Sequence, residues 1–152
     1  MIHLGNPSVR QQILQRIAAL KPNARQRWGR MSAHQTVCHL TDSFRVAMGE
    51  KYASPATGLL QRSLLKSMAL YFPVPWPHGV ATRPEVEQGR GGTPPGDFRN
   101  DRIELVSVIE RFSDSNRQFQ WARHPIFGRM SDRQWLRWGY LHADHHLRQF
   151  GV

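Results

Sequence analysis

The chain has almost no cysteine: Cys38 is the only one among 152 residues, so it cannot form an internal disulfide. Disulfides belong to oxidising compartments, and we therefore expect a cytoplasmic location. The first ten residues lack the apolar core that a signal peptide requires. No run approaches the roughly 18 apolar residues of a membrane span. On these grounds we expect no membrane partner.

Acidic residues are also scarce, with 11 Asp and Glu against 21 Lys and Arg, for a formal charge of +10. Such a balance suits phosphate, nucleic acid, anionic lipid or a carboxylated substrate. The cations are mostly arginines spread along the chain, without a basic block or tail. A solvated positive surface is therefore the favoured interpretation. A nucleic-acid-binding module stays as an alternative. The sequence contains neither a helix-turn-helix signature nor a platform of stacked aromatic and basic residues, and both absences argue against it.

The alternation of apolar and polar residues that marks strands is missing, whereas helical spacing recurs throughout the chain. Two helix starts carry capping boxes, Ser32 with Gln35 and Ser131 with Gln134. The expected helices cover residues 8–20, 32–49, 58–71, 98–118 and 131–151. Residues 72–98 hold six prolines and five glycines, which exclude a regular helix there. The sequence thus predicts one all-α domain over residues 1–152.

The third expected helix, residues 58–71, is apolar on more than one side. A helix of this kind is either deeply buried or part of a subunit contact. A homodimer is therefore one expectation for this chain.

The last expected helix carries His142, His145 and His146. At about 100° per residue, His142 and His146 fall near the edge of the inward face, and His145 lies toward solvent. Two histidines at i and i+4 can present ring nitrogens to one metal ion, but a third ligand must come from elsewhere. The candidates are His34, His39, His78 and His124. Ordinary hydrogen-bonded histidines are the alternative explanation.

Several segments in order along the chain resemble the DinB-like superfamily of metal-binding four-helix bundles, and within it an uncharacterised subfamily of unknown function. The resemblance covers almost the whole chain and rests on these segments: Trp28–Ser32 with His34–Phe44, Thr82–Glu85 and Gly92–Pro95, and His124–Gly128 with Trp135 and His142–Gln149. It implies a four-helix bundle with a long Pro/Gly-rich connection before the penultimate helix.

The resemblance also implies a metal site made by His39, His142 and His146, with His145 as an adjacent non-ligand. Helical periodicity alone would not have selected His39. The implied cofactor is one divalent transition metal, zinc or nickel as first choice and iron or manganese as second. Three ligands plus an open position is the pattern of catalytic rather than structural sites.

Relatives in that superfamily include thiol-dependent S-transferases and hydrolase-like enzymes. The resemblance therefore implies an enzyme that acts on a small molecule, with a thiol as a possible co-substrate. A non-catalytic metal-binding protein is the alternative.

The sequence contains no obvious catalytic base. Asp42 is either a partner that orients His39 or a solvated carboxylate, and Glu50, Glu85 and Asp97 are weaker candidates. Cys38 is interpreted as a small core residue.

The connection over residues 72–98 is the remaining open question. It either forms the rim of the site, with Trp76, His78 and Arg83 as walls and anion contact, or is a passive link between helices.

Overall fold

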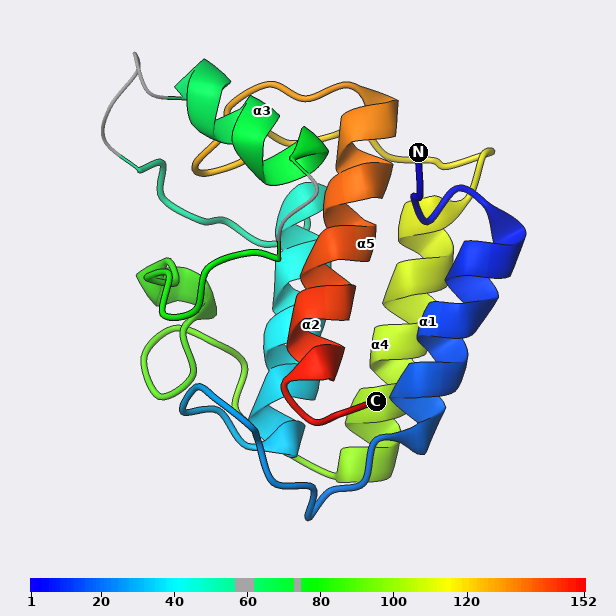
Figure 1. Ribbon diagram of the computed structural model, residues 1–152, viewed down its shortest axis with the longest axis vertical. Helices are drawn as coiled ribbons and strands as arrows, with labels where there is room; N and C mark the ends of the chain where they lie inside the picture. Colours follow the sequence, from blue (N-terminus) through cyan, green and yellow to red (C-terminus); the bar gives the residue numbers. More distant parts are fainter. Residues whose placement is uncertain (57–61, 73–74) are drawn as a thin grey trace.

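The computed structural model describes residues 1–56, 62–72 and 75–152, and these residues form an all-helical protein. Four long α-helices lie side by side, and a shorter helix crosses near one end of them (Figure 1). Their bounds are α1 Pro7–Ala19, α2 Ala33–Ala47, α3 Arg62–Tyr71, α4 Phe98–Ser113 and α5 Asp132–Arg148. The described residues contain no strand, only an isolated bridge between His124 and Gly128.

Local capping explains where the two helices that carry the candidate site begin. Ser32 accepts from the Gln35 backbone N–H, and the Gln35 side chain accepts from Ser32 N–H, so the capping box before α2 is confirmed. Ser131 and Gln134 make the same pair of bonds before α5. The predicted starts of α2 and α5 were therefore correct to within one residue.

Several predicted helix bounds need correction. α2 ends at Ala47 and α5 at Arg148, rather than at 49 and 151. α4 ends at Ser113 rather than at 118, because the Asp114 carboxylate accepts from Asn116 N–H and turns the chain away. α3 begins at Arg62, and the first residues of the predicted helix, 58–61, lie outside the described residues. Deep burial of α3 is also wrong, because Leu70 is buried but Leu64 and Met68 are more than half exposed.

The core lies between α1, α2, α4 and α5 and contains mostly aliphatic and aromatic side chains. α2 packs along α4, while α1 contacts α4 and α5. Phe44, Phe112, Trp135 and Trp138 fill the centre with edge-to-face and tilted ring contacts. None of the described helices is both long enough and apolar enough to cross a membrane.

The long connection between α3 and α4 lies against α2 rather than hanging free. A single 3-10 turn, Pro84–Val86, contacts α2. Further along, the Thr93 backbone and hydroxyl both bond the Asp42 carboxylate of α2. These contacts place residues 84–93 over the face of α2 that carries His39.

Candidate metal centre

His39 of α2 meets His142 and His146 of α5 inside the protein. His39 is 4 % exposed and His146 is 7 % exposed, while His142 is partly exposed. The His142 Nε2 atom lies 3.3 Å from His39 Nε2 and 3.1 Å from His146 Nε2. The structure thus brings together the three histidines that the resemblance selected from different parts of the chain.

Neighbouring oxygens determine how two of these rings are protonated. His39 Nδ1 donates to the Val86 carbonyl at 2.9 Å, and His146 Nδ1 donates to Gln149 Oε1 at 2.8 Å. A neutral imidazole has one N–H, so the Nε2 atoms of both rings carry lone pairs. Histidines that bind a metal through one ring nitrogen are commonly oriented by a hydrogen bond from the other nitrogen, as these two rings are from Nδ1.

Burial keeps all three rings neutral. It lowers the pKa of His39, a tendency that the Val86 carbonyl and Asp42 oppose. Burial also lowers the pKa of His142 and of His146 well below the ordinary value, with the neighbouring imidazoles adding to the effect. Neutral imidazole is the form that binds a metal.

Hydrogen bonds between the described residues leave part of this cluster unsatisfied. If His142 Nε2 carries the proton, it can donate to the Nε2 of His39 or to the Nε2 of His146, but not to both at once. The Nε2 lone pair of the other histidine is then left without a donor. The His142 Nδ1 atom is buried without a partner among the described residues. An ion would accept all three lone pairs together.

The spacing of the nitrogens also fits a metal ion. Metal–nitrogen bonds of about 2.05 Å place two ligand nitrogens roughly 3.3 Å apart at tetrahedral angles and roughly 2.9 Å apart at right angles. The observed separations of 3.1 and 3.3 Å lie within that interval. The donor set and its spacing therefore suit one transition metal ion.

A second group of potential ligands, His34, Cys38 and Asp101, has a different character. His34 Nε2 lies 2.6 Å from Asp101 Oδ2, which is a hydrogen-bond separation and shorter than two ligands of one ion would adopt. The same oxygen accepts from Gly96 N–H and contacts the Cys38 sulfur. This group is a hydrogen-bond network that holds the start of α4 against α2.

Cys38 is not a nucleophile in this arrangement. It is 3 % exposed, and burial together with Asp101 raises the pKa of its thiol to about 12. The thiolate is the reactive form, so a thiol with such a pKa is inert at neutral pH. The interpretation of Cys38 as a small core residue is consistent with its burial.

Asp42 is neither a solvated carboxylate nor the partner of His39. It is 0 % exposed and accepts from Thr93 N–H and Thr93 Oγ1 at 2.7 Å each, and from Lys51 Nζ at 2.8 Å. The Val86 carbonyl, and not Asp42, accepts the hydrogen bond from His39 Nδ1. Asp42 therefore anchors the connection before α4.

The weaker base candidates are also engaged elsewhere. Glu50 pairs with Arg111, and Asp97 caps α4 through Asn100 N–H. Bonds from its own backbone and from Ser54 lower the pKa of Glu85. None of these carboxylates belongs to the His39 group among the described residues.

The connection before α4 contributes to the walls around His142. The Trp76 ring lies 6.0 Å from His142 and 6.2 Å from His145, centroid to centroid, and its indole N–H donates to Ala69 O. His78 stacks on Trp28 at 4.4 Å and also faces His145. Trp76 thus lies beside His142, as the rim interpretation expects, and the choice between a rim and a passive link stays a prediction.

The other residues considered lie outside the triad. Arg83 donates to Ser54 Oγ instead of facing the histidines. His124 is buried in a tight turn, where its Nδ1 accepts from the N–H groups of Ile126 and Phe127. His145 lies between aromatic rings and is partly buried, because Trp28 and Trp76 cover the side expected to face solvent.

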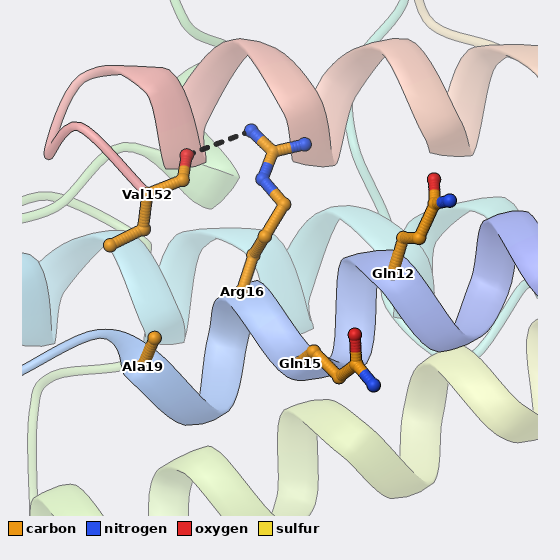
Figure 2. A pocket seen from close by; sticks show the side chains of 5 residues that line it. All are labelled: Gln12, Gln15, Arg16, Ala19 and Val152. Atoms are coloured by element: carbon orange, nitrogen blue, oxygen red, sulfur yellow. Dashed lines mark hydrogen bonds between the residues drawn. The ribbon is translucent and has the colours of Figure 1, made fainter.

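Two hollows on the surface of the described residues are lined by residues outside the triad. One, of about 430 Å³, lies beside α1, where Arg16 donates to the Val152 backbone oxygen (Figure 2). The other, of about 380 Å³, is lined by Gln120, Trp121, Ala122, Arg123, Arg129 and Met130. Neither contains a residue of the histidine triad.

The chain is thus an all-helical protein whose second and last helices share a cluster of three histidines. It belongs to the family described as protein of unknown function (DUF1569), which matches residues 8–151. Searches of curated proteins and of solved structures found no match.

Three contacts of the site had no signal in the sequence. The Val86 carbonyl and the Gln149 side chain orient His39 and His146, and Thr93 binds Asp42. A backbone carbonyl has no sequence signature, so the contact of Val86 with His39 could be found only in the folded structure.

Proposed function

We propose that His39, His142 and His146 hold one divalent transition metal and that the protein is a metal-dependent enzyme acting on a small molecule. The proposal rests on one observation. Hydrogen bonds to the Val86 and Gln149 oxygens leave the Nε2 atoms of His39 and His146 with lone pairs that face His142. Zinc or nickel suits three neutral imidazoles best, and iron or manganese follows. A DinB-like fold belongs to the same proposal, supported by four long helices and two inward histidines on the last one.

A bound ion would supply Lewis-acid activation of a nucleophile at the side that the three histidines leave open. The protein's own residues do the rest. Val86 and Gln149 hold two ligand rings in place, and the indoles of Trp76 and Trp138 lie beside His142.

The protonation chemistry favours a thiol over water as the nucleophile. Asp42, Glu50 and Asp97 are all bound to other partners, so none is free to remove a proton at the triad. A thiol has a pKa near 8.5 and needs far less activation than water does. We therefore place a thiol-dependent S-transferase before a hydrolase.

Turnover assays of metal-loaded protein test this proposal. Wild type, His142→Ala and His34→Gln are each loaded with zinc or nickel and assayed for thiol transfer to electrophiles and for ester and amide hydrolysis. We expect thiol transfer in wild type, its loss in His142→Ala, and its retention in His34→Gln, which removes an imidazole outside the triad. Equal rates in all three proteins, or none with any metal, would overturn the enzymatic proposal.

A further inference from the structure

Helix α3 presents an apolar face to solvent. Leu64 is 67 % exposed and Phe72 is 60 % exposed, although each is a large hydrophobic side chain. The exposed apolar residues of this segment are Leu64, Leu65, Met68, Tyr71 and Phe72. At about 100° per residue they share one sector of roughly 120°, and the buried Leu70 points the opposite way. Apart from the Gln134 side chain of α5, which donates to the Tyr71 hydroxyl, this face makes no polar contact that covers it among the described residues.

Apolar side chains are also exposed at the N-terminus. Met1 and Ile2 are each 51 % exposed. The Arg137 guanidinium donates from Nε to Leu70 O at 3.2 Å and from Nη1 to Ile2 O at 2.8 Å. One side chain of α5 thus connects the end of α3 to the first residues of the chain. We call the exposed residues 64–65, 68 and 71–72 the α3 surface.

Cations lie on α3 itself and on the loop and helix that contact it. Lys66 donates to the Arg129 carbonyl, which brings the loop before α5 next to α3, and Arg129 lines a hollow with Arg123. The cations of these segments are Lys66, Arg123, Arg129, Arg133 and Arg137. None of the five has a carboxylate within ion-pair distance in the described parts of the chain. The nearby Asp132 pairs with Arg117 instead. Apolar side chains and uncompensated cations therefore lie together.

Charge selects among the partners that could cover this surface. A second copy in a two-fold contact would place the same five cations opposite one another, with no acid to offset them. A nucleic acid would use the cations but leave Leu64, Leu65 and Met68 without a role. An anionic bilayer uses both features, because lipid phosphates attract the cations and the interface accepts the apolar side chains.

We propose that the α3 surface docks the protein on the surface of an anionic lipid bilayer. The expectation of no membrane partner rested on the lack of a spanning run, and surface docking needs no such run. The proposal does not depend on the metal centre, because no residue of the α3 surface belongs to the triad.

Sedimentation with vesicles tests the proposal. The full chain is mixed with vesicles of phosphatidylcholine alone, or with about a third phosphatidylglycerol, at low and physiological salt. We expect binding to the anionic vesicles only, weakened by salt. Leu64→Asp should lower the partition coefficient at least about tenfold, and Arg133→Gln about fivefold.

Matched variants elsewhere on the molecule separate docking from diffuse attraction. Ile103 is 57 % exposed on α4, and Arg99 is exposed at the start of that helix. Ile103→Asp and Arg99→Gln should leave binding within about twofold of wild type. Equal losses in these variants, or no binding to anionic vesicles, would overturn the proposal. So would dimerisation that Leu64→Asp abolishes, because a second copy would then cover the surface.

Discussion

Asp42 shows how much one residue's surroundings decide its role. On a helix wheel it lies one turn from His39, and that spacing cannot distinguish a metal-site partner from a surface carboxylate. The structure places it at 0 % exposure, bonded to Thr93 and Lys51. Its function is to hold the connection before α4, which in turn supplies the carbonyl that orients His39.

Replacing Asp42 by Asn should therefore lower stability, and metal should still bind because all three ligand histidines remain. The amide would present a donor to Lys51 or Thr93, and we expect a loss of about 2–4 kcal/mol in the free energy of unfolding. Asp144→Asn is the control, because the Arg16–Asp144 pair is partly exposed and should contribute less than about 1 kcal/mol. Urea denaturation measures both. A stable Asp42→Asn protein that no longer binds metal would contradict this role.

His124 predicts a specific dependence of stability on pH. Burial lowers its pKa to about 3, well below the value of about 6.5 in an unfolded chain. Between these values the unfolded chain binds a proton that the native protein does not. The free energy of unfolding should thus fall by about 1.4 kcal/mol for each pH unit of acidification.

His124→Asn isolates this contribution. The Asn side chain keeps an acceptor for the Ile126 and Phe127 N–H groups but does not titrate. Urea denaturation of metal-free protein between about pH 6 and pH 4 should show a slope smaller by about 1.4 kcal/mol per unit in the variant. The same slope in both proteins would mean that His124 is not buried as described.

At the scale of elements, close approach between α5, α4 and the N-terminal segment depends on Gly139. A Cβ atom there would lie 2.7 Å from Phe112 Cε1 and 3.0 Å from Leu4 Cδ1, both in the core. Gly139→Ala should lower the free energy of unfolding by about 1–2 kcal/mol, despite the higher helix propensity of alanine. In a Phe112→Leu background the same change should cost less, because the ring edge is gone. Thermal unfolding of the four proteins tests this, and a stabilising Gly139→Ala would refute it.

The elements that the sequence predicted well are those set by local chemistry. The Ser32 and Ser131 capping boxes depend only on residues three apart, so the starts of α2 and α5 could be read directly. The end of α4 was placed too late, because the Asp114 turn competes with a helix that apolar spacing alone would continue. The exposure of α3 depends on which neighbours reach it, and periodicity does not contain that information.

At the scale of the whole molecule, the candidate site depends on segments far apart in sequence. His39 and His142 are 103 residues apart, and a carbonyl from the connection between α3 and α4 supports the first of them. The His142–His146 spacing was visible in the sequence, but the third histidine was selected by resemblance. The Val86 and Gln149 oxygens that support the rings could be identified only from the folded structure.

A metal bound between α2 and α5 should stabilise the entire fold. At an ion concentration about 100 times the Kd, the gain is about 2.7 kcal/mol, which corresponds to a rise in Tm of roughly 5–10 °C for a chain of this size. A chelator should reverse the rise in wild type, and His142→Ala should show neither change. Differential scanning calorimetry with and without zinc makes the comparison. Equal shifts in both proteins would indicate binding outside the triad.

The most direct test of the metal centre is elemental analysis of protein purified without a histidine tag and reloaded with zinc, nickel or manganese. Wild type is compared with His39→Ala, His142→Ala and His146→Ala, with His145→Ala as the matched control on the same helix. The account predicts about one ion per chain in wild type and His145→Ala, and its loss in each triad variant. No ion in wild type under any loading condition, or undiminished content in the triad variants, would contradict it.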